Sequence, residues 1–163
     1  MRLVVRFHVI AVGKAKEPFF RDGVAEYIRR LTGMAEFIVT EVVDERLPDN
    51  AGDAEKIRIL AKEGNRILSH VRPQDLCIVL DVGGKPMTSE AFAHYLNDAI
   101  LEGNSRIAVV IGGSLGIAPE VRSRADLLLS FGLMTFPHQM ARLILAEQVY
   151  RAMMINAGRQ YHR

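Results

Sequence analysis

The chain has 163 residues, 49% of them hydrophobic and 25% charged, with a formal net charge of +2. This composition is that of an ordinary globular protein with one buried core, so we expect a single domain over residues 1–163. Its one cysteine, Cys77, excludes an intrachain disulfide, and no apolar run approaches the about 20 residues that span a bilayer. We therefore expect a cytoplasmic protein without a membrane partner. An RNA partner would require the basic residues to be concentrated locally.

Strand and helix patterns alternate in the first half of the chain. The sequence predicts a strand over residues 3–12, a helix over 18–32 and a second strand over 37–43. The two strands are predicted from β-rich runs, and the helix from a helical repeat that follows a proline. After a loop, a second helix ends before Pro73. Its predicted apolar face consists of Ala54, Ile57, Ala61, Gly64, Ile67, Leu68 and Val71.

The second half repeats this alternation with tighter turns. Continuous apolar runs over residues 76–80 and 107–111 are typical of strands buried on both faces of a parallel sheet. The remaining predicted elements are a helix capped by Thr88 or Ser89, a helical turn from Pro119, a strand over 127–129 and a helix from Pro137 to about Ala157. The fold class is therefore α/β, with a mainly parallel sheet and helices on both faces.

Glycines follow three of the predicted strands, in the segments 83–84, 112–116 and at Gly132. Ligands of open parallel sheets bind outside the carboxyl ends of the strands, and glycine lets the backbone approach a ligand closely. The segment 112–116 is neither a dinucleotide fingerprint nor a phosphate-binding P-loop. Alone it is also compatible with a tight turn, but the three segments together predict a pocket.

The last predicted helix carries apolar residues around most of its circumference. They are Met140, Leu143, Ile144, Leu145, Val149, Ala152, Met153, Met154 and Ile155. A terminal helix of this kind needs more cover than one sheet face supplies. We therefore expect a homodimer built on this helix.

A few polar residues are candidates for chemistry. The five histidines have no ligand spacing and no cysteine partner, so no metal site is predicted. His138 begins the last helix, where it is either an acid/base group or a turn residue, and Asp81 either binds a ligand or caps a turn. The segment 159–163 combines an aromatic ring with hydrogen-bond donors that suit RNA, although a frayed terminus gives the same pattern.

Five ordered segments make the chain resemble the ribosomal RNA large subunit methyltransferase H family. The similarity starts at Ala11-Val12-Gly13-Lys14 and covers nearly the whole chain. The segments are Leu80-Asp81 with Gly84-Lys85; Val110-Ile111-Gly112-Gly113-Ser114 with Gly116; Leu129-Ser130-Phe131 with Met134-Thr135-Phe136-Pro137-His138-Gln139-Met140; Glu147-Gln148-Val149-Tyr150-Arg151-Ala152; and Tyr161-His162-Arg163.

The resemblance implies a dimeric SPOUT methyltransferase whose C-terminal trefoil knot holds S-adenosyl-L-methionine (AdoMet). Periodicity alone cannot predict a knot, because knots are nearly absent from proteins. The family methylates N3 of pseudouridine 1915 in helix 69 of 23S rRNA, in the assembled 70S ribosome. By the same resemblance, the residues expected at the cofactor are Leu80, Gly112, Phe131, Gly132, Leu133, Met134, Thr135 and Phe136.

The resemblance leaves the proton acceptor open, because no carboxylate pair or catalytic triad is evident in the sequence. Our hypothesis is that Arg142 or the tail residues Tyr161, His162 and Arg163 stabilise the developing anion, with His138 a weaker candidate as base. In a dimer, the tail of one protomer could complete the pocket of the other.

Three other functions are compatible with parts of the sequence. They are a Rossmann-type oxidoreductase or ordinary methyltransferase, a non-catalytic ribosome-binding factor, and methylation of a different RNA. The first would need an early glycine fingerprint followed by an acidic residue, and Gly13 provides none.

Overall fold

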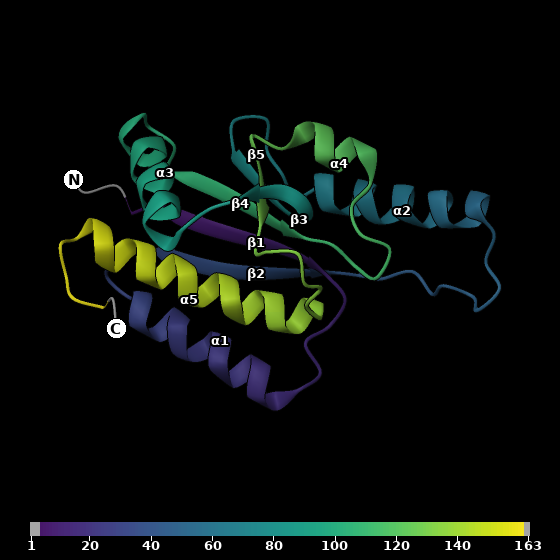
Figure 1. Ribbon diagram of the computed structural model, residues 1–163, viewed down its shortest axis with the longest axis horizontal. Coiled ribbons are helices and arrows are strands. Elements are labelled where there is room, and N and C mark those ends of the chain that lie inside the picture. Colours follow the sequence, from purple (N-terminus) through teal and green to yellow (C-terminus); the bar gives the residue numbers. More distant parts are fainter. Residues whose placement is uncertain (1–3, 162–163) are drawn as a thin grey trace.

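The computed structural model describes residues 4–161, which form one sheet of five parallel strands flanked by five helices (Figure 1). The strands lie in the order β2-β1-β4-β3-β5. The elements are β1 (Arg6–Val12), α1 (Pro18–Leu31), β2 (Glu36–Val42), α2 (Asp53–Leu68), β3 (Leu76–Pro86), α3 (Ser89–Leu101), β4 (Arg106–Ile111), α4 (Pro119–Arg124), β5 (Leu127–Ser130) and α5 (His138–Asn156). The predicted α/β class with a parallel sheet is confirmed.

The helices form a layer on each face of the sheet. α1, α3 and α5 cover one face, and α2 and α4 cover the other (Figure 1). Each face has its own apolar core, because neighbouring strand residues point to opposite sides: Val9 and Val109 belong to one core, Ile10 and Val110 to the other. This explains the unbroken apolar runs that were predicted to be strands buried on both faces.

Cys77 lies in β3, on the side of the sheet covered by α2 and α4, and is fully buried. Burial raises the pKa of its thiol to about 11, since an apolar environment disfavours the thiolate. Cys77 is therefore a buried strand cysteine whose thiol is disfavoured as a nucleophile.

β3 continues beyond the predicted end at Leu80. It pairs with β5 up to Leu80↔Leu129, bulges outward, and resumes pairing at Lys85↔Leu129. A Cβ on Gly84 would lie 2.8 Å from the backbone of Leu128, so only glycine lets the returning chain lie this close to β5. The predicted turn is thus a bulge within one strand, because the chain returns to the same edge partner.

The predicted apolar face of α2 is wrong in its first two turns. Ala54 and Ile57 are exposed, Ile57 by 68%, because this end of the helix extends beyond the sheet (Figure 1). The buried line is instead Ile59, Glu63 and Ile67. Helical spacing identified the helix, but it could not indicate where the sheet beneath it ends.

The apolar circumference of α5 is covered only in part within the same chain: Leu145, Val149 and Ala152 are buried, whereas the half-buried residues are Met140, Leu143, Ile144, Met153, Met154 and Ile155. α5 lies on the sheet between α1 and α3 (Figure 1), and it has no exposed residue before Asn156. Its contact with α1 is close, since a Cβ on Gly23 would lie 2.8 Å from Leu143 Cδ1. Some apolar surface of α5 therefore remains accessible in the single chain, and the homodimer stays a prediction.

Candidate active site

A cleft of about 650 Å³ opens at the carboxyl ends of β3, β4 and β5. Two of the three glycine-bearing segments, 112–116 and Gly132, contribute to its walls, whereas Gly83 and Gly84 do not: β3 contributes residues 80–82 instead. The lining residues are Leu80, Asp81, Val82, Ile111, Gly112, Gly113, Ser114, Gly116, Ile117, Leu129, Phe131, Gly132, Met134, Thr135, Phe136, Pro137, His138 and Ala141. The volume suits a ligand of nucleoside size.

The loop after β4 forms a wall made largely of backbone. A Cβ on Gly112 would lie 2.6 Å from the carbonyl oxygen of Gly116 and 2.6 Å from Ile117 Cδ1. Gly116 has a φ of +85°, a left-handed conformation that favours glycine. The loop folds back on itself through a bridge between Gly113 and Gly116, so its peptide groups stand directly at the cleft.

The loop after β5 forms the opposite wall. The Ser130 hydroxyl accepts a hydrogen bond from the Gly132 amide at 3.0 Å, and Gly132 has a φ of +117°. Of the six loop residues expected at a cofactor, five line the cleft, and Leu133 does not. Leu133 is 93% exposed at the loop tip. The expectation that Leu133 lies at the cofactor is therefore without support in this geometry.

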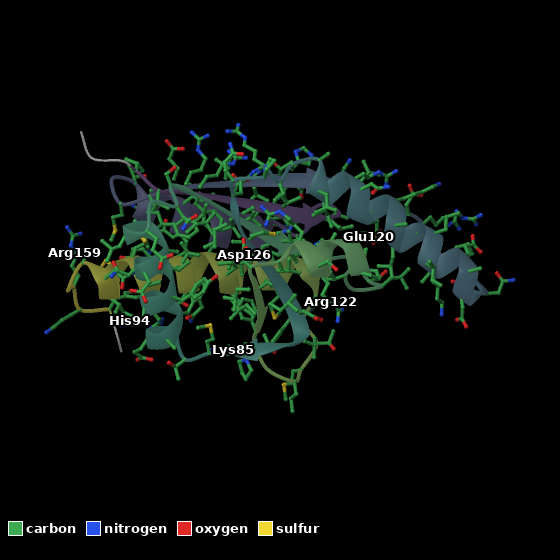
Figure 2. All side chains as sticks on the ribbon, turned by 90° about the horizontal axis from the view of Figure 1, so that it is seen from above. Lys85, His94, Glu120, Arg122, Asp126 and Arg159 are labelled. Atoms are coloured by element: carbon green, nitrogen blue, oxygen red, sulfur yellow. The ribbon has the colours of Figure 1, made fainter. Side chains whose placement is uncertain are left out.

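β3 contributes an apolar and an acidic side chain. Leu80 lines the cleft beside Asp81, which stands where the strand begins to bulge. Asp81 Oδ2 lies 3.3 Å from Nη1 of Arg122, on α4 (Figure 2). The acidic residue thus belongs to the cleft itself, which sequence reasoning had left undecided between ligand binding and turn capping.

His138 also lines the cleft, and its ring packs against Gly13. Its Nδ1 lies 3.3 Å from Arg142 Nη2. A guanidinium can only donate, so Nδ1 accepts and Nε2 carries the proton of the neutral ring. Burial and the charge of Arg142 both lower the pKa of His138, so the ring is neutral at pH 7. This state suits a hydrogen-bond donor at Nε2 better than the base considered from the sequence.

Arg142 does not line the cleft. It is 4% exposed, its Nη1 lies 2.6 Å from Glu41 Oε2, and its Nη2 donates to the carbonyl oxygen of Gly13 at 2.7 Å. The guanidinium ties α5 to the ends of β1 and β2. Its charge is thus engaged in a structural contact, which argues against direct stabilisation of a reacting anion.

Tyr161 lies at the far end of α5. Its ring packs edge-on against Tyr150 at 4.7 Å between centroids, and the Arg151 guanidinium stacks on it at 4.9 Å. Tyr150 lies about 18 Å from His138 along α5 at 1.5 Å per residue, so Tyr161 is separated from the cleft of its own chain. Figure 2 shows Arg159 at one end of the molecule, away from Arg122. His162 and Arg163 lie outside the described residues.

Sequence reasoning missed Glu63, a buried carboxyl group behind the loop after β4. Its Oε1 accepts the amide of Glu45 at 3.1 Å, and a Cβ on Gly113 would lie 3.4 Å from its Oε2. Burial raises its pKa. The signal was present in the sequence, because Glu63 falls four residues after Ile59 and four before Ile67, on one helix face.

A second, basic cavity of about 490 Å³ lies on the other side of Arg142. Lys14, Lys16 and Arg21 line it together with apolar residues of α1. None of the three makes an ion pair among residues 4–161. The local concentration of positive charge that an RNA partner needs is therefore present near the cleft.

The described residues include neither a candidate metal-binding cluster nor a candidate membrane-spanning helix. Within the part of the chain that the structure describes, no group of three or more His, Cys, Asp or Glu residues could hold a metal ion. No helix in that part is long and apolar enough to cross a membrane.

Comparison with known proteins gives matches along nearly the whole chain. A family model described as predicted SPOUT methyltransferase matches residues 5–162. The chain is 52% identical to the ribosomal RNA large subunit methyltransferase H of Streptococcus thermophilus (strain CNRZ 1066) over 159 residues, 98% of this chain and 100% of that protein. The protein of the same name from Carboxydothermus hydrogenoformans is 48% identical over 155 residues, 95% of this chain and 98% of its own length.

Among solved structures, the fold is similar to that of a probable methyltransferase from Bordetella pertussis Tohama I. The TM-score is 0.56 at 14% identity, and the match covers 91% of this chain and 96% of that one. At this identity the similarity concerns the fold alone.

Proposed function

Since the chain belongs to the SPOUT methyltransferases and, within them, to the ribosomal RNA large subunit methyltransferase H family, we propose that it transfers a methyl group from AdoMet to large-subunit rRNA. The target is N3 of pseudouridine 1915 in helix 69 of 23S rRNA, in the assembled 70S ribosome of the cytoplasm. The observation that carries this proposal is the cleft at which the glycine-bearing loops after β4 and β5 meet residues 80–82 of β3. The proposal includes a trefoil knot formed by the chain around this cleft.

The residues of the cleft fit AdoMet. Leu80, Phe131 and Phe136 offer apolar surface to an adenine ring, and the loop at Gly112 offers peptide groups to its edge. Atoms of Gly116 and Ile117 already occupy the space that a Cβ at position 112 would fill. Gly112 therefore presents its backbone to the ligand and no side chain. Gly132, Met134 and Thr135 complete the wall.

AdoMet supplies an activated methyl group, so the protein has to position the pseudouridine and promote loss of its N3 proton. An imide proton titrates about two to three units above neutral pH, which corresponds to about 3–4 kcal/mol at 1.36 kcal/mol per unit. The developing negative charge on the base needs donors near it. His138, with its proton on Nε2, is one donor that this chain places at its own cleft.

The remaining donors come from a second protomer in this proposal. Tyr161 packs on Tyr150, which lies about 18 Å along α5 from the cleft residue His138 of the same chain. The tail residues Tyr161, His162 and Arg163 therefore serve the cleft of the partner in a homodimer. Lys14, Lys16 and Arg21 supply a basic surface for the RNA backbone.

A chain truncated after Gln160 is expected to bind AdoMet with unchanged affinity and to methylate ribosomes at least tenfold more slowly. The cleft residues remain, whereas the donors of the tail are lost. Calorimetric titration with AdoMet and incorporation of labelled methyl groups into ribosomes measure the two properties. A normal methylation rate in the truncated chain would show that the tail has no part in the reaction.

The proposed target is tested by mapping the methylated nucleotide on ribosomes from a strain that lacks the protein. Reverse transcription and mass spectrometry before and after incubation with enzyme and AdoMet should show one new methyl group, at N3 of pseudouridine 1915. Naked 23S rRNA is the control substrate, and we expect it to be methylated poorly because the net charge of +2 supports only weak binding to free RNA. A methyl group at another position would contradict the proposed target.

A further inference from the structure

Asp81 provides the one carboxylate among the residues described as lining the cleft. The second titratable side chain there, His138, is kept neutral by its burial and by the neighbouring charge of Arg142. Glu63 lies behind the wall, where its Oε1 already accepts a backbone amide. The cleft therefore presents a single negative charge, at the point where β3 begins to bulge.

We propose that Asp81 makes the cleft selective for a cationic ligand, so that the carboxylate stabilises bound AdoMet more than S-adenosylhomocysteine. This inference rests on the proposed function, since it assigns to one residue the discrimination between the donor and its spent form. When the methyl group leaves, its bond to sulfur breaks and the electron pair stays on sulfur. The bound cofactor then loses one positive charge.

The contact with Arg122 keeps the Asp81 carboxylate in place. Oδ2 lies 3.3 Å from Arg122 Nη1, and the Asp81 side chain is 16% exposed, whereas that of Arg122 is 50% exposed. An ion pair with so exposed a partner screens the carboxylate only partly. One interaction leaves the other oxygen of Asp81 available, because a carboxylate accepts several hydrogen bonds.

The position of Asp81 at the edge of an apolar cleft makes its charge effective. Charges interact more strongly where apolar walls replace water, and the attraction acts on the ligand without requiring direct contact. The carboxylate therefore favours the sulfonium form of the cofactor over the neutral thioether. The expected consequence is that AdoMet replaces the bound product more readily than it would in an uncharged cleft.

The test compares three ligands by calorimetric titration of the full-length protein. AdoMet and sinefungin carry a positive charge at or beside the reacting centre, and S-adenosylhomocysteine carries none there. In Asp81→Asn, we expect the Kd of the two cationic ligands to rise about tenfold and that of S-adenosylhomocysteine to rise less than threefold. Aspartate and asparagine have nearly the same shape, so the substitution removes the negative charge and changes little else.

Glu120→Gln is the matched control. Glu120 lies on α4, two residues before Arg122 (Figure 2), and does not line the cleft. Its replacement removes the same charge from the same region and should change each Kd less than twofold. An equal loss for all three ligands in Asp81→Asn, or no loss, overturns the proposal. Failure of the unchanged protein to bind any of them would instead overturn the proposed function.

Discussion

Replacement of Gly112 by alanine is expected to weaken AdoMet binding by more than about 100-fold, or about 2.7 kcal/mol. The new Cβ would lie 2.6 Å from the carbonyl oxygen of Gly116 and 2.6 Å from Ile117 Cδ1. Ile117 could rotate away, but the carbonyl belongs to the backbone, so the loop itself would have to move. That loop is a wall of the cleft, and calorimetric titration with AdoMet measures the consequence.

Gly52→Ala is the control for this substitution. Gly52 has an ordinary φ of −76°, and nothing lies within 4 Å of the Cβ that alanine would add. AdoMet affinity should stay within twofold of that of the unchanged protein. If Gly112→Ala also retained normal affinity while folding normally, the loop after β4 would not be part of the cofactor site.

Replacement of Arg142 by methionine is expected to lower the free energy of unfolding by about 2–3 kcal/mol. The buried guanidinium is the partner of Glu41 and of the Gly13 carbonyl group, and removing one member of such a set leaves the others without compensation. The Glu41 side chain is 38% exposed, so water recovers part of the loss. Urea denaturation at one fixed protein concentration measures the change.

Arg29→Met is the matched control for Arg142→Met. Arg29 Nη2 also lies 2.6 Å from a glutamate oxygen, on Glu26, but its side chain is 71% exposed. An exposed pair of this kind contributes little, so we expect the urea midpoint of Arg29→Met to stay close to that of the unchanged protein. Equal effects of the two substitutions would mean that burial of Arg142 does not decide its contribution.

The strands and helices were largely predictable because their signals are local. The apolar runs at residues 76–80 and 107–111 and the helical repeat after Pro18 correspond to β3, β4 and α1. The bulge of β3 was not predictable in this way. It depends on the return of the chain to β5, about 50 residues later, and a turn and a bulge have the same glycine-rich sequence.

The cleft was predictable in outline, because three glycine-bearing strand ends of a parallel sheet meet at one edge. The position of individual side chains was not. Leu133 belongs to the right loop but is 93% exposed at its tip, and Arg142 points away from the cleft to Glu41. The direction in which a side chain points depends on contacts with residues distant in the sequence. A helical or strand periodicity carries no information about those contacts.

The burial of Cys77 makes this chain suitable for site-specific labelling. A thiol with a pKa of about 11 is present as thiolate in roughly one molecule in a few thousand at pH 7.5, and maleimides react with the thiolate. The protein therefore behaves toward such reagents as if it had no cysteine. A cysteine introduced in place of the exposed Arg159, beyond the end of α5, would carry a fluorophore alone. Energy transfer between two such labels would then report whether the tails of two protomers approach each other during turnover.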